Sequence, residues 1–525
     1  MTGSKRFSRR RFLETGAAVL GTAAMPFGGA RAAGAKYIRY NATSAEGQAM
    51  LKSYATAIRK MLALDPHDAR NWFRNAFIHN LDCPHMNWWF FDWHRGYLGW
   101  FEQTVREMSG NAQFAFPYWD WSQTGGATPG YCIPDTMLHD VLTPLDEAYK
   151  PYISSFDAFY KYLNPALEAF WKTLSSDQLE ALTIRQMDKL PSLWEQVKTG
   201  MFANIENARY LRTGDACLDD NTQQAVAADN VDDGLSAPTF AEFNSGESKQ
   251  HSLMGQTSGL LESQPHNLTH NNVGGYQHVP NADVGFMTDN LSPVDPIFFL
   301  HHSNMDRLWD VWTRKQQSCK QPYLPAGADW SRFANEKFMF YVNAQGQPVT
   351  QILAGSYTDM SQFGYAYQPG TGEETIGKCP PVLLASQKRA IAGTVKAGAA
   401  TLAVAPSMLS SSRGHPVIAK IKVPYPTSPG APRNFAVLVN APAGNTDTSS
   451  KSPYYAGSIS FFGFMPGMKG MSATFSVPLS RVLKAQKGSK LKELNIEVVP
   501  QTAPGKALLK ARPASTVQAA SVTVW

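Results

Sequence analysis

The spacing of apolar residues changes once along the chain, near residue 390. Before that point, residues 48–64, 71–80 and 91–107 repeat apolar side chains every three to four positions, which predicts amphipathic helices. After it, short segments alternate apolar and polar residues and are separated by proline and glycine, which is typical of the strands of a β-sandwich. We therefore expect a mainly α domain, built as a helical bundle, followed by a C-terminal β-sandwich domain.

The middle of the chain gives a weaker pattern. Residues 143–194 contain helical pieces, whereas residues 215–247 are acidic, contain glycine and asparagine, and are expected to form loops. We place the helical domain at residues 33–372, a linker at 373–389 and the β-sandwich at 390–525.

The first 32 residues carry the charge imbalance. Six lysine and arginine residues stand there against Glu14, which accounts for +5 of the formal net charge of +6. The sequence SRRRFL at residues 8–13, a weakly apolar run and the small residues at 30–32 are typical of a twin-arginine signal peptide. We expect the twin-arginine machinery to export the protein to the periplasm or the medium; the alternative is a basic arm with a short amphipathic helix.

Composition excludes two classes of partner. The chain after residue 32 is nearly neutral, so it offers no electrostatic basis for binding nucleic acid or an anionic membrane. No apolar run is long enough to span a bilayer, so we expect no membrane anchor.

Histidine carries the candidate chemistry. His266 and His270 are four residues apart, a spacing that places both on one face of a helix. Either His301 or His302 could supply a third nitrogen, because consecutive helical residues point about 100° apart. A second group consists of His79, His85 and His94.

These residues alone predict two adjacent metal sites, each with three imidazole nitrogens. Imidazole suits copper, zinc, iron or nickel. Neither group comes with the HExxH glutamate of a zinc protease or with paired thiolates. A zinc hydrolase is therefore a distant alternative, and the metal remains open at this point.

Longer motifs around these histidines resemble the tyrosinase and polyphenol oxidase family, the type-3 copper proteins that also include haemocyanins. The family's first copper signature, H-x4-F-apolar-x-W-H-R-x2-L-x3-E, is matched at residues 85–102. The second, D-P-x-F-apolar-x2-H-x3-D, is matched at residues 295–306, and PYWDW at residues 117–121 lies between them as in the family. The resemblance implies two copper ions in the helical bundle, with these ligands: His79, His85 and His94 for one, His266, His270 and His302 for the other.

The resemblance also implies an enzyme that uses O2 on a small phenolic substrate. A tyrosinase-like member hydroxylates monophenols at the ortho position and oxidises o-diphenols to o-quinones. Glu262 and Asn267 stand where plant-type relatives order a water that takes the phenol proton. Where catechol oxidases often carry a blocking phenylalanine, this chain has Thr288, Asp289 and Asn290, with Phe286 earlier. Both features favour hydroxylation.

Three alternatives within the resemblance stay open. They are a catechol oxidase, an o-aminophenol oxidase without monophenolase activity, and a haemocyanin-like O2 carrier. The resemblance also leaves room for a copper-delivery partner. Asp306 and Glu102 are candidates for fixing the tautomers of the ligand histidines.

The five cysteines add two further expectations. The spacing of Cys83 and His85 is similar to that of fungal and molluscan relatives, in which the cysteine forms a thioether to the histidine; the alternative is a buried free thiol. The remaining cysteines, Cys132, Cys217, Cys319 and Cys379, can form up to two disulfides of unknown pairing.

A C-terminal domain in relatives lays one bulky side chain over the copper pocket and would keep the enzyme latent. The candidates for this placeholder are Phe461, Phe462, Phe464 and Met465. The alternative is that these side chains fill the core of the β-sandwich.

Overall fold

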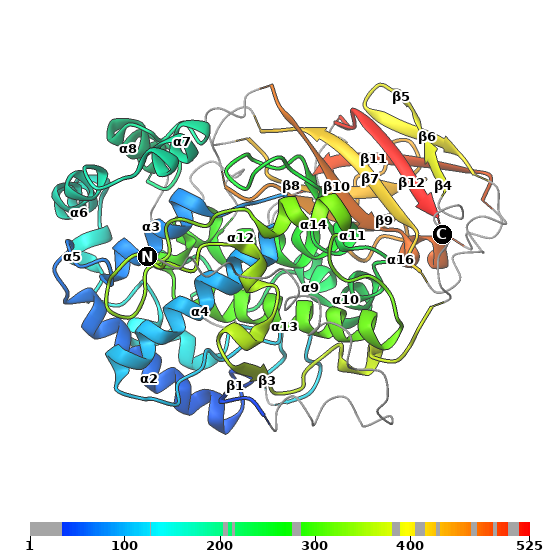
Figure 1. Ribbon diagram of the computed structural model, residues 1–525. Helices are drawn as coiled ribbons and strands as arrows, with labels where there is room; N and C mark the ends of the chain where they lie inside the picture. Colours follow the sequence, from blue (N-terminus) through cyan, green and yellow to red (C-terminus); the bar gives the residue numbers. More distant parts are fainter. Residues whose placement is uncertain are drawn as a thin grey trace, which may run out of the picture.

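The structure, a computed structural model, describes residues 34–126, 128–202, 208–212, 216–275, 285–380, 389–404, 415–426, 431–463, 470–486, 491–501 and 514–524. A helical part and a β-rich part lie side by side, as expected for a helical domain followed by a β-sandwich (Figure 1). The segment 1–32, with its signal motif, and the placeholder candidates Phe464 and Met465 lie outside the described residues.

Four long helices form the centre of the helical part. They are α2 (Ala45–Leu62), α3 (Trp72–Asp82), α4 (Phe90–Ser109) and α13 (Ile297–Ser318). The first three confirm the helices predicted at residues 48–64, 71–80 and 91–107. Ser44 and Asn71 accept hydrogen bonds from backbone N–H groups in the first turns of α2 and α3, and Gly110, at φ +74°, ends α4.

The other helices of this part surround these four. The α-helices are α5 (Lys150–Ile153), α6 (Phe156–Trp171), α7 (Ser176–Ile184), α8 (Leu190–Thr199), α9 (Asp220–Val226), α10 (Ala228–Leu235), α11 (Phe240–Phe243), α12 (Asn267–Gly274) and α14 (Gly327–Ala334). A π-helical turn, η4 (Glu262–His266), leads into α12. The 3-10 turns are η2 (Asp135–Leu138), η3 (Asp140–Leu142), η5 (Phe286–Thr288), η6 (Ser292–Val294), η7 (Ala354–Tyr357), η8 (Met360–Gln362) and η9 (Glu373–Thr375).

The prediction of loops over residues 215–247 is wrong, because α9, α10 and α11 lie there. The side chains of Asp219 and Thr239 accept hydrogen bonds from the first turns of α9 and α11. Val226, Val231 and Leu235 are buried against the helical core. These helices are too short to show a clear period. Tertiary packing stabilises all three, and side-chain caps add to this in α9 and α11.

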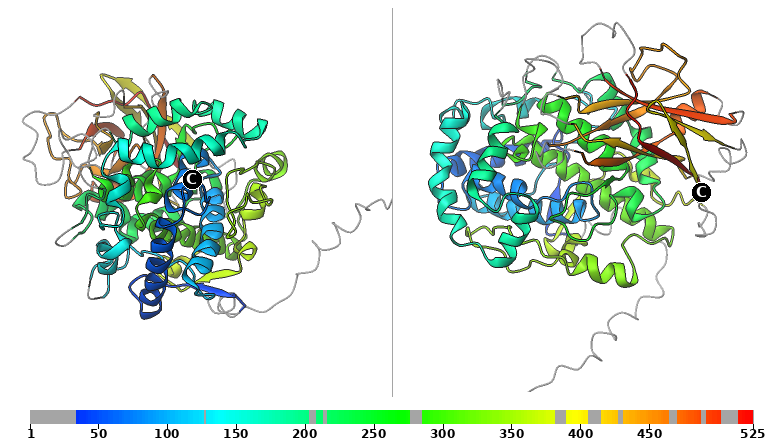
Figure 2. Two further views of the ribbon diagram at one scale, coloured as in Figure 1. Left: turned by 90° about the vertical axis from the view of Figure 1, so that its left-hand side faces the viewer. Right: turned by 90° about the horizontal axis from the view of Figure 1, so that it is seen from above.

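The β-rich part contains two five-stranded sheets, in the orders β2-β10-β7-β12-β4 and β5-β6-β11-β8-β9. The strands are β2 (Thr257–Ser258), β4 (Arg389–Ala392), β5 (Thr394–Lys396), β6 (Ala399–Ala403), β7 (Ile418–Pro424), β8 (Asn434–Val439), β9 (Tyr455–Ser460), β10 (Ser472–Pro478), β11 (Glu493–Pro500) and β12 (Ala519–Val524), with helix α16 (Ser480–Ala485) after β10. Apolar side chains of both sheets, such as Phe475 and Ile496, share one core. This is the expected β-sandwich, which Figure 2 shows packed along one side of the helices.

The two parts are joined by more than the chain connection. β2 belongs by sequence to the helical part, yet it pairs in parallel with β10 of the sandwich. The disulfides are Cys132–Cys217 and Cys319–Cys379, and the second ties the end of α13 to the segment that leaves the helical part. At the other end, β1 (Tyr37–Arg39) pairs in parallel with β3 (Tyr365–Tyr367). Among the described residues, no helix is both long and apolar enough to cross a membrane.

Candidate metal centre

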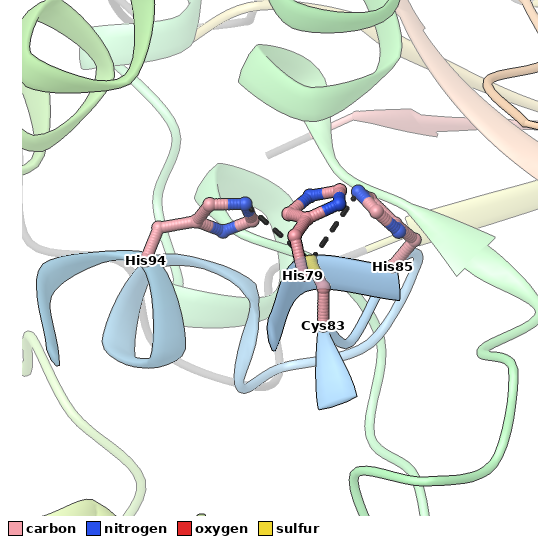
Figure 3. A group of neighbouring side chains, drawn as sticks. All are labelled: His79, Cys83, His85 and His94. Carbon is pink, nitrogen blue, oxygen red and sulfur yellow. Dashed lines mark hydrogen bonds between the residues drawn. The ribbon is translucent and has the colours of Figure 1, made fainter. Parts of the chain in front are cut away.

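The first histidine group is assembled from two helices and the loop between them. His79 lies near the end of α3, His94 lies on α4, and His85 follows Pro84 in the connecting loop. The ring centroid of His79 lies 5.3 Å from that of His85 and 5.6 Å from that of His94. Figure 3 shows the three imidazoles turned toward one another around Cys83.

The second group comes from α12, α13 and the π-helical turn. His266 ends the turn, His270 follows one helical turn later, and the Nε2 atoms of His270 and His302 are 3.1 Å apart. Pro265 sits inside the turn and has no N–H to donate, which suits the wider hydrogen-bond pattern of a π-helix. The turn therefore sets the direction in which His266 enters the centre.

The two groups face each other. The rings of His94 and His302 stack at 4.0 Å with an interplanar angle of 9°, and the rings of His85 and His266 are 6.0 Å apart. The side chains of Phe90 and Phe298 line the space between the groups, with ring centroids 4.7 Å from His266 and 4.2 Å from His302 respectively. Six imidazoles thus converge in an apolar, aromatic surrounding.

His301 also lies within reach of the second group, so geometry alone does not separate it from His302. Hydrogen bonding does. The indole N–H of Trp121 donates to His301 Nδ1 over 3.1 Å, so this nitrogen carries no proton. A neutral imidazole then holds its proton on Nε2, which makes Nε2 a donor and a poor metal ligand. The hydrogen bond from Trp121 therefore favours His302, the residue that the motif selects.

Four of the six imidazoles are oriented by a hydrogen bond from Nδ1. Nδ1 of His94 donates to Phe90 O (2.7 Å), and Nδ1 of His79 donates to Asn290 O (2.7 Å). Nδ1 of His270 donates to Met287 O (2.8 Å), and Nδ1 of His266 donates to Asn267 Oδ1 (2.8 Å). A proton on Nδ1 leaves Nε2 as the lone-pair nitrogen, which is the tautomer that binds a metal.

Asp306 and Glu102, expected to fix these tautomers, bind arginines instead. Arg39 Nε donates to Glu102 (2.9 Å), and Arg95 Nε donates to Asp306 (2.7 Å). The hydroxyls of Tyr365 and Tyr367 also donate to Asp306. Because each tyrosine is on β3, this buried network fixes α4 and α13 to the strands that close the helical part.

Burial keeps the imidazoles neutral. Loss of solvent lowers the pKa of His94 and of His270 to about 3 and lowers those of His79, His85, His266 and His302 well below the ordinary value. The Nε2 atoms of His79 and His266 are buried without a hydrogen-bond partner among the described residues. Uncharged imidazole nitrogens that converge in two groups of three are donors that suit a pair of copper ions.

The side chains of Glu262 and Asn267 hydrogen-bond to different groups. Glu262 is buried, accepts from Met86 N (2.7 Å) and contacts Ser245 Oγ, and burial raises its pKa to about 8. Asn267 accepts from His266, while its Nδ2 donates to Ser460 O of the sandwich over 2.8 Å.

Cys83 is a buried free thiol in the structure, at the centre of the first group. Its Sγ lies 3.5 Å from His85 Nε2 and 3.4 Å from His94 Nε2 (Figure 3), and burial raises the thiol pKa. A cavity of about 660 Å³ reaches Cys83 and His85 from the side of Arg185 and Met254.

The two described placeholder candidates occupy different places. Phe461 packs inside the sandwich against Tyr425 and Phe475, at 4.9 and 5.0 Å between ring centroids. Phe462 instead lies over the centre, 4.7 Å from His85 and 4.5 Å from His270. Successive residues of an extended segment point to opposite sides, so one aromatic fills the core and the next reaches the histidines.

Other histidines lie outside the centre. His139 is exposed beside Asp135, whereas His251 is buried between the carboxylates of Asp82 (2.8 Å) and Glu336. Sequence reasoning identified the imidazoles but missed the carbonyls of Met287 and Asn290. Every residue has a carbonyl, so no signal in the sequence could have found them.

Comparison with known proteins gives consistent results. Residues 55–315 match the common central domain of tyrosinase. The tyrosinase HcTyr1 of Hahella sp. is 27% identical over 352 residues, which cover 61% of this chain and 60% of that protein. The chloroplastic polyphenol oxidase of Spinacia oleracea is 25% identical over 346 residues, which cover 62% of this chain and 45% of that protein. The match thus spans less than two thirds of either relative.

Solved structures extend the likeness to the sandwich. A latent aurone synthase, which is a polyphenol oxidase, superposes with a TM-score of 0.58 at 18% identity over 93% of this chain and 90% of that one. Latent apple tyrosinase gives a TM-score of 0.54 at 19% identity over 92% and 97%. The arrangement of helices and sandwich is therefore shared with these proteins.

Proposed function

The chain belongs to the tyrosinase family of type-3 copper proteins, and on that premise we propose that it is a polyphenol oxidase. It uses O2 to hydroxylate monophenols at the ortho position and to oxidise o-diphenols to o-quinones. The observation that carries the proposal is the pair of facing histidine groups with uncharged, inward-directed nitrogens. When bound, the two copper ions of the family supply the electrons that reduce O2.

The proposed ligands are His79, His85 and His94 for one copper and His266, His270 and His302 for the other. The Nδ1 hydrogen bonds support this set, because in the four residues that make them the proton lies on Nδ1 and Nε2 keeps its lone pair. Neutral imidazoles would not cancel the charge of a bound metal, so the site would still favour an anionic phenolate.

Glu262 and Asn267 are the proposed machinery for removing the phenol proton. A general base works best with a pKa near the working pH, and burial raises the pKa of Glu262 to about 8. Asn267 is next to His266, so its amide can hold a water beside the second group once it no longer donates to Ser460 O. Phe286 supports an open pocket, because it packs against Phe202 at 6.1 Å between ring centroids.

We assign the placeholder role to Phe462. Its ring contacts histidines of both groups, at 4.7 Å from His85 and 5.7 Å from His266, where a phenol ring would have to approach. The protein is then latent as long as the sandwich stays docked. Apple tyrosinase, which shares the arrangement of helices and sandwich, is likewise known in a latent form.

Two covalent or cellular features complete the proposal. Cys83 forms a thioether to the ring of His85: one hydrogen is lost from the thiol and one from a ring carbon, and O2, the oxidant of the proposed reaction, takes up the two electrons. The 3.5 Å approach of the Cys83 sulfur to His85 supports this bond. The twin-arginine segment at residues 8–13 directs export of the protein, and a copper-delivery partner loads the site.

One oxygen-uptake series tests the proposed function. The copper-loaded protein is assayed with tyrosine, L-DOPA and o-aminophenol, before and after proteolytic release of the sandwich. Uptake with both tyrosine and L-DOPA supports a tyrosinase. Uptake with L-DOPA alone indicates a catechol oxidase, preference for o-aminophenol indicates that rival activity, and reversible O2 binding without turnover indicates a carrier.

A further inference from the structure

The β-sandwich touches the groups that orient the histidines, in addition to covering them. Of the four Nδ1 hydrogen bonds, the bond of His94 ends on its own helix, at Phe90 O. The other three end on Asn267 Oδ1, Met287 O and Asn290 O. Each of these acceptors is contacted by the sandwich directly or lies within two residues of a carbonyl that the sandwich binds.

The contact to His266 runs through one side chain. Asn267 Oδ1 accepts from His266, and the Nδ2 of the same amide donates to Ser460 O in β9 over 2.8 Å. This second hydrogen bond fixes which end of the amide faces the imidazole, so His266 must donate from Nδ1. Its Nε2 is left for the metal.

The contacts to His79 and His270 run through residues 287–290. The carbonyls of Met287 and Asn290 accept from His270 and His79, which belong to different groups. Between them, Thr288 O accepts from Arg433 Nη1 (3.1 Å) and from the backbone N–H of Gly463 (3.3 Å). One short segment thus presents its carbonyls to the second group, to the sandwich and to the first group.

The contacts around Arg433 hold its side chain in one position. The side chain is buried, the charge of Asp289 lies near enough to act on it, and Arg433 O accepts from Phe461 N (3.0 Å). Residues 286–288 form only a 3-10 turn, η5, and a turn of this kind is held less firmly than an α-helix. External hydrogen bonds such as that from Arg433 therefore decide where the two carbonyls point.

We infer that Arg433 is a positioning residue for the copper site, and that the docked β-sandwich orients His79, His266 and His270 for metal binding. The sandwich then has two separable effects: Phe462 blocks the pocket, and Arg433 with Ser460 O holds the ligands. Release of the sandwich opens the site but lowers its affinity for copper. The inference rests on the ligand set proposed above.

The test measures equilibrium Cu(I) affinity of the full chain by anaerobic competition with a chromophoric chelator such as bicinchoninate. Removing a group that orients metal ligands typically weakens binding by about 10- to 100-fold, so we expect Arg433→Met to weaken it by about 10-fold. Arg433→Lys, which keeps a donor and the charge, should recover most of this loss. An equilibrium measurement is insensitive to how easily the chelator enters.

Two controls separate the inference from a general loss of docking. Lys420→Met removes a contact between sandwich and helices, Lys420 Nζ to Glu242 Oε1 at 3.3 Å, that involves none of residues 287–290. Phe462→Ala removes the cover alone. Both should keep the parental affinity within about twofold, well below the range expected for lost ligand orientation.

Unchanged affinity in Arg433→Met, or an equal loss in Lys420→Met, would overturn the inference. Circular dichroism shows whether each variant folds. If Arg433→Met does not fold, Arg433→Gln replaces it, because the glutamine side chain is too short to reach Thr288 O. Failure of the proposed function looks different: the unmodified chain then fails to bind two copper ions at all.

Discussion

At the scale of single residues, burial and hydrogen bonding fix the protonation states of the side chains in the centre. The imidazoles stay neutral far below pH 6, since burial lowers the pKa of His94 and His270 to about 3. The opposite happens at Glu262, where burial raises the pKa to about 8. One apolar environment thus gives uncharged imidazoles and a carboxyl group with a pKa near neutral pH.

Glu262→Gln tests the proposed base. The amide keeps an acceptor for Met86 N but cannot take a proton, so tyrosine turnover should fall by about 100-fold. L-DOPA turnover should change much less. The rise of tyrosine turnover with pH toward 8, expected as Glu262 ionises, should disappear in the variant. Initial rates of oxygen uptake over a pH series give the answer, and equal losses on both substrates would remove the assignment.

His251 offers a second test of buried charge. Asp82 and Glu336 raise its pKa despite burial, so the folded state favours the imidazolium. A raised pKa of this kind gives stability that is fully present below the unfolded pKa of about 6.5 and is lost as pH rises through the folded value.

We expect His251→Gln to lower the free energy of unfolding by about 3 kcal/mol at pH 6, because the buried Asp82 loses its charged partner. The deficit should shrink as pH rises. Denaturant titrations at several pH values measure it, with His67→Gln, an exposed histidine beside Asp65, as the control that should change little. A deficit independent of pH would mean that the contact is not ionic.

At the scale of elements, the predictability of the helices follows their length. The period of α2, α3 and α4 is visible in the sequence because each spans three turns or more. α9, α10 and α11 are too short for that. Val231 and Leu235 of α10 are buried, but only the packing of this helix against α13 shows that they are core positions. The π-helical turn before α12 is also invisible to a 3.6-residue pattern, although it directs His266.

The packing of α4 gives a prediction at this scale. A Cβ at Gly99 would lie 2.2 Å from a ring carbon of Phe363, so the helix approaches that ring as closely as glycine allows. Gly→Ala in a helix normally stabilises by about 0.5–1 kcal/mol. Here Gly99→Ala should destabilise by about 1–3 kcal/mol through overpacking.

Urea unfolding followed by circular dichroism measures the change. Glu107→Ala, at an exposed position of the same helix, is the control and should stay within about 0.5 kcal/mol. A stabilised Gly99→Ala would show that Phe363 moves aside freely.

At the scale of the molecule, the sequence identifies the two parts and their class of fold but not how they meet. The motifs contain His85, His94 and His302, and the four-residue spacing adds His266 and His270. The choice of His302 over His301 agrees with the hydrogen bond from Trp121. Sequence reasoning could not choose between Phe461 and Phe462, because that depends on which face of the segment after β9 meets the helices. Disulfide pairing and the role of residues 287–290 depend likewise on tertiary contacts.

Phe462→Ala tests whether this ring keeps the enzyme latent, and Phe461→Ala is the comparison. Loss of the ring that contacts both histidine groups should raise L-DOPA turnover of the intact chain by about 10-fold, since each 1.4 kcal/mol of blocking energy corresponds to about a factor of ten. Phe461→Ala removes a core side chain instead, so it should destabilise the sandwich by about 3–5 kcal/mol. If Phe462→Ala has the parental turnover, the ring does not limit access.

The most direct test of the central claim is the copper content of the full chain and of two neighbouring variants. Atomic absorption on purified protein should give two copper ions per chain for the unmodified protein and for His301→Gln, and no more than one for His302→Ala. Loss of the second copper in His302→Ala should abolish oxygen uptake with L-DOPA. A single copper ion in the unmodified protein, or two in His302→Ala, would contradict the account.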